Sequence, residues 1–104
     1  EMVDVPPSLL HPDHYVLQVK GNSMIDEHIH DGDYIVAKKA NTAYSGQIVV
    51  ALINGEATLK CYFNGKNGIE LHPRNPDFPV IKVDSKDDFH INGVLLYSFR
   101  NYLN

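Results

Sequence analysis

The sequence has few of the cysteines, long apolar runs or basic residues that disulfide-linked, membrane-spanning or nucleic-acid-binding proteins need. Its one cysteine, Cys61, excludes an internal disulfide and fits a reducing compartment. The longest apolar run is the six residues Ile48–Ile53, far short of the roughly 20 that cross a bilayer. Lys+Arg 9 against Asp+Glu 13 gives a net charge of −4 without a basic block, so we do not expect this chain alone to grip a phosphate backbone.

The N-terminal residues lack the basic start and the apolar core of a signal peptide. A hydrophobic fraction of 43% and a charged fraction of 21% are typical of globular proteins. A length of 104 residues allows one domain with a single core. We therefore expect a soluble, cytoplasmic chain that forms one domain over residues 1–104 and has no membrane partner.

Frequent turn signals predict a mostly β chain, with short strands in curled antiparallel sheets. Asn-Gly supplies the two positive φ angles of a type I′ hairpin, and Asp31-Gly32-Asp33 adds a further break. No long window keeps a helical period, so we expect only one or two short helical turns, after Ser8 and after Ser23. The Asn-Gly pairs are Asn54-Gly55, Asn64-Gly65, Asn67-Gly68 and Asn92-Gly93. The expected strands cover residues 15–20, 34–38, 47–53, 56–63, 69–72, 79–83 and 94–99.

The clearest element is a hairpin over residues 47–63 that turns at Asn54-Gly55. Its first strand, Ile48–Ile53, is apolar at every position, which predicts burial on both faces. On its second strand, alternation places Lys60 on one face and Cys61 on the other. Lys60 could be an edge-strand lysine that points to water and blunts edge pairing, or it could be buried beside the apolar strand. The spacing alone leaves both interpretations open.

Ser23 follows a predicted strand that ends near Gly21. A serine at the start of a helical turn usually caps it by accepting a hydrogen bond from a backbone N–H two or three residues later. The same position also suits a nucleophile, because free backbone N–H groups at such a junction can stabilise an oxyanion. A serine nucleophile needs a base, and lysine is one known partner.

Taken together, these segments resemble the self-cleaving Ser-Lys peptidase domain of LexA-type repressors, UmuD-type polymerase subunits and related phage repressors. The separation of 37 residues between Ser23 and Lys60 is the spacing of that family. The resemblance extends from about Ser8 to Arg100. The matching blocks are Gly21-Asn22-Ser23-Met24-Ile25-Asp26, Asp31-Gly32-Asp33, Gly55-Glu56-Ala57-Thr58-Leu59-Lys60, Leu71-His72-Pro73-Arg74-Asn75-Pro76-Asp77-Phe78-Pro79 and Ile91-Asn92-Gly93-Val94.

The resemblance implies a catalytic dyad within a fold of the LexA and signal-peptidase type, with no cofactor. Ser23 is expected to be the nucleophile, and Lys60 the general base that returns the proton to the leaving amine. The backbone N–H groups of Ser23 and Asn22 are expected to form the oxyanion hole, with Asn22 acting only through its backbone. Lys60 must lose roughly 3 pKa units to act near neutral pH, and burial against Ile48–Ile53 without a carboxylate partner can lower its pKa.

Parts of a self-cleaving precursor are missing from this sequence. It contains neither the Ala-Gly nor the Cys-Gly pair that such precursors cleave, and none of the 22 residues before Ser23 suggests a helix-turn-helix. We therefore interpret residues 1–104 as the C-terminal autoproteolytic and dimerisation domain of a LexA-like SOS-response repressor. The resemblance implies a homodimer, activation by a recombinase filament on single-stranded DNA, and DNA contact only through a missing N-terminal domain.

Three alternatives remain at this point. A UmuD-like subunit of an error-prone polymerase and a prophage repressor belong to the same peptidase family. A non-catalytic β interaction module belongs to another class, and a solvent-facing Lys60 would favour it.

Two other parts of the sequence carry residue types that can form a site. His28 and His30 lie near Asp26, Asp31 and Asp33, which could suggest a metal cluster, but we interpret this segment as a polar loop and expect no metal. Alternation points Cys61 away from Lys60, so we expect a small core residue there. The apolar run over residues 94–99 is expected in the core or at a subunit interface.

Overall fold

The computed structural model describes residues 11–102, and within them the chain is mostly antiparallel β. This confirms the predicted fold class, including the short helical turn after Ser23; the turn expected after Ser8 lies outside the described residues. No helix in the described part of the chain is long and apolar enough to cross a membrane. The elements are β1 (His14–Gln18), η2 (Ile25–Glu27), β2 (Tyr34–Lys39), β3 (Ile48–Ile53), β4 (Glu56–Gly65), β5 (Gly68–His72), β6 (Ile81–Lys82) and β7 (Phe89–Phe99).

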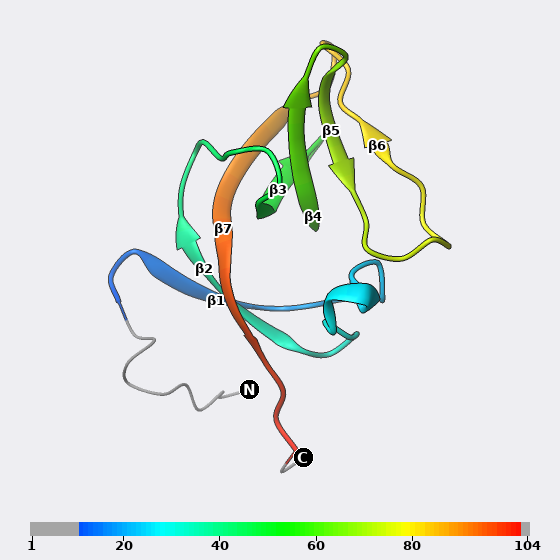
Figure 1. The fold of residues 1–104 in the computed structure, drawn as a ribbon. Helices are drawn as coiled ribbons and strands as arrows, with labels where there is room; N and C mark the ends of the chain where they lie inside the picture. The colour runs from blue at the N-terminus through cyan, green and yellow to red at the C-terminus, as the bar shows by residue number, and fades with distance from the viewer. Residues whose placement is uncertain (1–10, 103–104) are drawn as a thin grey trace.

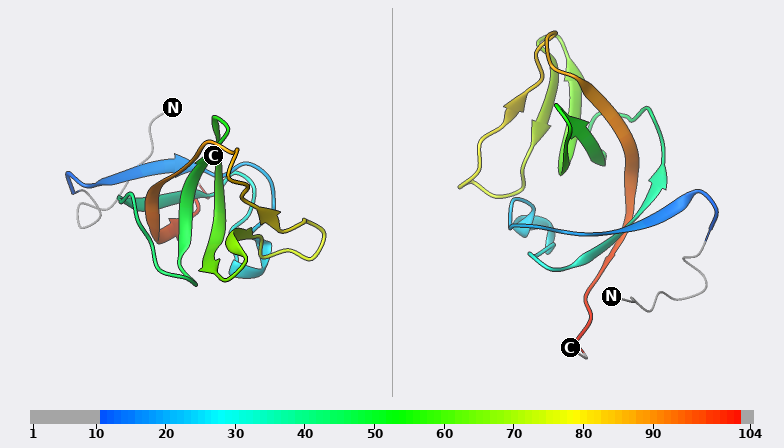
Figure 2. Two further views of the ribbon diagram at one scale, coloured as in Figure 1. Left: turned by 90° about the horizontal axis from the view of Figure 1, so that it is seen from above. Right: turned by 180° about the vertical axis from the view of Figure 1, so that it is seen from behind.

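The strands form one sheet in the order β1-β2-β7-β3-β4-β5-β6, and it curls strongly without closing (Figure 1). The long strand β7 holds the two halves together, because it pairs with β3 from Phe89 to Val94 and with β2 from Gly93 to Phe99. Figure 2 shows β7 bending continuously from one half to the other. The curl brings the helical turn η2 and the loop after β5 to the same side of the molecule (Figure 1).

Asn92-Gly93, predicted from its sequence to be a turn, instead lies inside β7, so that prediction was wrong. Asn92 is an extra residue against β3, because the register shifts between Val50, which faces Gly93, and the next residue, which faces Ile91. Such a bulge bends the strand and increases its twist. The glycine allows a close approach rather than a turn, since a Cβ at position 93 would lie 2.4 Å from the Tyr15 hydroxyl oxygen.

The hairpin at Asn54-Gly55 is confirmed. Asn54 and Gly55 have φ angles of 51° and 84°, and they connect the paired residues Ile53 and Glu56. In the next hairpin, residues 66–67 form the turn, so Asn64-Gly65 falls inside β4 rather than in a turn.

Two apolar clusters fill the fold, one on each face of β3. Val50 belongs to the first cluster, together with Met24 and Ile35, while Val49 and Ala51 belong to the second. Burial of β3 on both faces is therefore confirmed. Because Met24 is almost fully buried in the first cluster, the chain next to Ser23 is anchored in the core.

Candidate active site

Ser23 and Lys60, which are 37 residues apart in sequence, meet in space. Lys60 projects from β4, Ser23 lies just before η2, and 3.0 Å separates Lys60 Nζ from Ser23 Oγ. Lys60 is only 8% exposed, and the residue opposite it on β3 is the fully buried Val49. The interpretation of Lys60 as a lysine that points to water is therefore wrong, because its side chain is buried.

The surroundings of the Lys60 amine are polar but uncharged. Nζ donates to Thr58 Oγ1 at 2.6 Å and to the Leu59 carbonyl at 3.2 Å, besides Ser23 Oγ. No carboxylate of the described residues forms an ion pair with it. Burial lowers the pKa of Lys60 from its ordinary value because the charged form loses hydration. A lysine in these surroundings gives up its proton more readily than one in water.

The serine does not cap the helical turn. Met24 occupies the N-cap position of η2, and no side chain caps it. The Ser23 carbonyl accepts a hydrogen bond from the Arg74 N–H at 2.7 Å, which ties the serine to the loop after β5. Within residues 11–102, neither the Ser23 N–H nor the Asn22 N–H donates to a protein acceptor. In the part of the chain that the structure describes, these two consecutive N–H groups therefore have no protein acceptor.

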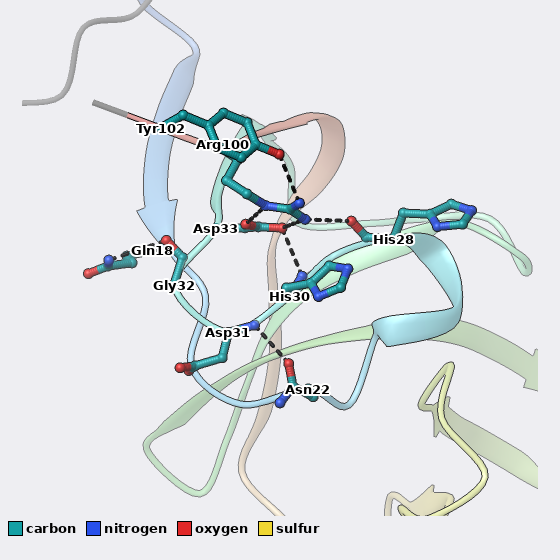
Figure 3. A network of polar contacts seen from close by, with 9 residues as sticks. All are labelled: Gln18, Asn22, His28, His30, Asp31, Gly32, Asp33, Arg100 and Tyr102. Atoms are coloured by element: carbon teal, nitrogen blue, oxygen red, sulfur yellow. Dashed lines mark hydrogen bonds and ion pairs between the residues drawn. The ribbon is translucent and has the colours of Figure 1, made fainter. Parts of the chain in front are cut away.

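The side chain of Asn22 makes a specific contact, which corrects the expectation that this residue acts only through its backbone. Its Oδ1 accepts a hydrogen bond from the Asp31 N–H at 2.9 Å (Figure 3). Asp31 Oδ1 in turn accepts a hydrogen bond from the Gly21 N–H at 2.7 Å. These two bonds join the Gly21-Asn22 segment to the loop before β2. They hold the backbone immediately before Ser23.

The turn predicted at Asp31-Gly32-Asp33 is present, with Gly32 at a φ angle of 87°. Asp33 is 3% exposed, and its carboxylate accepts hydrogen bonds from Arg100 Nε and Nη2 at 2.6 and 2.9 Å (Figure 3). It also accepts the His30 N–H at 2.8 Å. The Arg100 hydrogen bonds lower the pKa of Asp33 against the opposing effect of burial.

The two histidines of this loop, His28 and His30, form hydrogen bonds through their backbone groups. His28 adopts a left-handed conformation at the end of η2, and its carbonyl lies 3.5 Å from Arg100 Nη2. Figure 3 shows the His28 ring directed away from the Asp33 carboxylate. In the part of the chain that the structure covers, no group of three or more His, Cys, Asp or Glu side chains is arranged to hold a metal ion.

Cys61 is fully buried, as predicted for a core residue. Its Sγ donates to the Gly46 carbonyl at 3.4 Å and lies 3.1 Å from Arg74 Nη2. Burial raises the pKa of the thiol, with Arg74 opposing the effect. A thiol of this kind is a poor nucleophile.

An apolar cleft of about 340 Å³ opens beside the Ser23–Lys60 pair. One of its walls is the first part of β4, whose pairing with β5 begins only at Cys61, so the outer edge of β4 before Lys60 is not covered by that strand. An extended peptide that lies in the cleft has apolar surface to contact and a strand edge beside it. The cleft is lined by Leu17, Gln18, Val19, Lys20, Ser23, Met24, Ile35, Val50, Ala57, Thr58, Leu59 and Lys60.

Three contributors to this site were not identified from the sequence. Thr58 shares the face of Lys60, so strand alternation could have suggested it. Asn75 Nδ2 donates to the Asn22 carbonyl at 2.9 Å, and Arg100 reaches Asp33 from the end of the chain. No local pattern signals either of these long-range contacts.

A known protein family and several curated proteins are similar to this chain over most of its length. Residues 1–96 match the model of the family described as Peptidase S24-like. The chain is 45% identical over 103 residues to a LexA repressor of Syntrophotalea carbinolica, which covers 98% of this chain and 51% of that protein. It is 52% identical over 80 residues to a LexA repressor of Xylella fastidiosa, covering 77% of this chain and 38% of the relative. A LexA repressor of Delftia acidovorans is 44% identical over 99 residues, covering 93% and 44%. The chain thus spans about half or less of the length of these curated relatives.

Proposed function

The chain belongs to the Peptidase S24-like family, and we propose that it is a Ser-Lys endopeptidase domain that cleaves its own precursor. In this proposal Ser23 is the nucleophile and Lys60 the general base. The observation that carries it is the 3.0 Å contact between Ser23 Oγ and the buried Lys60 Nζ, with no carboxylate paired to the amine among residues 11–102. A relic dyad in a non-catalytic module would not need to keep a lysine desolvated.

The reaction runs in two steps. Neutral Lys60 Nζ takes the proton of Ser23 Oγ while the oxygen attacks the scissile carbonyl carbon. The tetrahedral intermediate collapses to a serine ester as the peptide C–N bond breaks, and Lys60 gives the proton to the leaving amine. Water then attacks the ester: Lys60 takes a proton from the water, and Ser23 Oγ recovers it when the C–O bond breaks.

The charge that develops on the carbonyl oxygen needs donors that are already in place. We assign this role to the Ser23 and Asn22 N–H groups, which have no acceptor within the described residues. The hydrogen bonds of Asn22 and Asp31 restrain the backbone that carries these groups. The donors therefore need little rearrangement as the reaction proceeds.

At the level of the whole protein, we propose a LexA-like SOS-response repressor, of which this chain is the C-terminal autoproteolytic and dimerisation domain. The LexA repressors of the comparison support this proposal, and they extend well beyond the matched region. A recombinase filament on single-stranded DNA would activate cleavage, DNA would be contacted by an N-terminal domain, and the protein would act in the cytoplasm as a homodimer. Exposed apolar side chains of β7, Leu96 and Tyr97, are compatible with a subunit contact.

The test is cleavage in trans. This chain is mixed with a longer form of the protein that carries the upstream residues and Ser23→Ala, and cleavage is followed from about pH 7 to about pH 10. We expect a rate that rises with pH and is lost in chains with Ser23→Ala, Lys60→Ala or Lys60→Arg. The arginine variant keeps the positive charge but cannot act as a base, because its guanidinium stays protonated throughout this pH range. Lys66→Arg, in the exposed hairpin turn, is the matched control.

Cleavage that persists in the Ser23→Ala or Lys60→Ala chain would reject the dyad. Failure of the wild-type chain to cleave in trans would not reject the proposal by itself. If the intact longer protein also failed to cleave itself at high pH, the peptidase proposal would be wrong, and a non-catalytic β module would remain.

A further inference from the structure

The Asn22–Ser23 peptide is held by a side chain from a distant loop. Asn75 Nδ2 donates a hydrogen bond of 2.9 Å to the Asn22 carbonyl oxygen across 53 residues of sequence. The Ile25 N–H donates to the same oxygen at 3.3 Å. In a planar trans peptide the C=O and the following N–H point in opposite directions. Fixing the Asn22 carbonyl therefore fixes the direction of the Ser23 N–H.

A second hydrogen bond orients the Asn75 side chain for this contact. Its Oδ1 accepts a hydrogen bond from the Asp77 N–H at 2.9 Å, as in an Asx turn, and the side-chain nitrogen is thereby turned toward Asn22. The neighbouring Arg74 N–H donates to the Ser23 carbonyl at 2.7 Å, so the same loop holds both the peptide before Ser23 and the peptide after it. This loop therefore restrains the backbone on both sides of Ser23.

We propose that Asn75 is a positioning residue that aims the Ser23 N–H at the developing oxyanion through its hydrogen bond to the Asn22 carbonyl. The inference rests on the proposed function, because it gives a role to a donor of the proposed oxyanion hole. A hydrogen bond to the carbonyl also polarises the peptide and makes its N–H a better donor. Asn75 touches neither Ser23 Oγ nor Lys60 in the described contacts, so its effect is on the hole rather than on the base.

The test uses this chain and a fluorophosphonate probe, whose phosphoryl oxygen gains negative charge in the transition state. Ser23 Oγ forms a bond to phosphorus, fluoride leaves, and Lys60 takes the serine proton. Asn75→Asp keeps the Oδ1 acceptor of the Asx turn but loses the Nδ2 donor, whereas Asn75→Leu loses both without adding charge. Asn67→Asp, in an exposed turn, controls for the added charge.

We expect both Asn75 variants to lower the maximal rate of inactivation about 10-fold, which is less than the loss of an oxyanion donor itself. The probe concentration for half-maximal inactivation should not change, and Asn75→Leu should keep the pH midpoint because Lys60 sets it. A role limited to packing would instead alter the melting temperature without changing the maximal rate in folded protein.

An Asn75→Asp chain that reacts at the wild-type maximal rate would overturn the inference, even if Asn75→Leu were slow, since only the Asx turn would then matter. Ser23→Ala and Lys60→Ala separate this failure from failure of the proposed function. If these two variants abolish labelling and Asn75→Asp does not slow it, only the role of Asn75 is rejected. If the wild-type chain is not labelled, or is labelled independently of Ser23 and Lys60, the proposed function fails and the inference with it.

Discussion

Asp33 and Arg100, 67 residues apart in sequence, form a two-pronged ion pair in which the carboxylate is buried and the guanidinium lies at the surface. The pair ties the residue that follows β7 to the loop that carries Asp31, which in turn contacts Gly21 and Asn22. The end of the sheet is thus connected to the backbone beside Ser23 by a short series of hydrogen bonds (Figure 3).

Removing the guanidinium should destabilise the chain because it leaves a buried carboxylate without its main partner. For Arg100→Met we expect a fall in melting temperature of about 5 °C at neutral pH, with a smaller fall for Arg100→Lys, which keeps the charge but not the paired geometry. Differential scanning fluorimetry measures both.

The same pair predicts a pH dependence. Arg100 lowers the pKa of Asp33 in the folded state, so the stabilisation is present above the ordinary pKa of 3.8 and is lost as the pH falls through the lower folded value. The difference in melting temperature between wild type and Arg100→Met should therefore shrink in acid. A constant difference from about pH 7 to about pH 3 would contradict this prediction.

Thr58→Val should change both the height and the midpoint of the pH–rate profile. Thr58 Oγ1 lies 2.6 Å from Lys60 Nζ and accepts a hydrogen bond from the ammonium form, which stabilises the charged state. Its loss should lower the pKa of Lys60 further and move the midpoint to lower pH. The maximal rate should fall about 10-fold because the amine loses a contact that orients it toward Ser23. Thr58→Ser, which keeps the hydroxyl, should behave like wild type in the same cleavage assay; an unchanged Thr58→Val profile would exclude this role.

The elements predicted well from the sequence depend on local rules. Asn54-Gly55 forms its hairpin because the required positive φ angles are available at those two residues. The double burial of Ile48–Ile53 follows from a strand without a polar position. Ser23 and Lys60 could be paired only through the family spacing, since alternation along β4 did not decide whether Lys60 was covered.

The elements that the sequence did not reveal depend on neighbours far along the chain. Asn92-Gly93 has the composition of a turn, but β2 and β3 pair with β7 on both sides and convert the dipeptide into a bulge. The contacts of Asn75 with Asn22, and of Arg100 with Asp33, join loops whose approach only the folded sheet defines.

Gly93→Ala tests the reinterpretation of that dipeptide. A methyl group at this position would lie 2.4 Å from the Tyr15 hydroxyl oxygen and 2.8 Å from the Lys38 carbonyl oxygen. We expect the free energy of unfolding to fall by about 1–3 kcal/mol, measured by urea denaturation. Adding Tyr15→Phe should restore only part of the loss, because the backbone carbonyl remains. Gly65→Ala is the matched control, since its Cβ would meet nothing within 4 Å; equal losses in the two alanine variants would show that close packing is not the cause.

Lys60 should lower the free energy of unfolding at pH values where its amine is charged. Its folded pKa lies below the ordinary value of 10.5, because burial disfavours the ammonium form. Between the two pKa values the unfolded chain binds more protons than the folded chain, so the wild-type free energy of unfolding rises with pH across this window. Lys60→Met has no titrating group at this position. As the pH rises from about 7 toward 10.5, the free energy of unfolding of the wild type should therefore increase relative to that of the variant. Urea denaturation of both chains at several pH values measures this difference, and Lys66→Met controls for the loss of a surface charge. A difference that stays constant, or that shifts toward the variant, would mean that the folded chain does not depress the pKa of Lys60, and the dyad would then lack the property that makes its lysine a base.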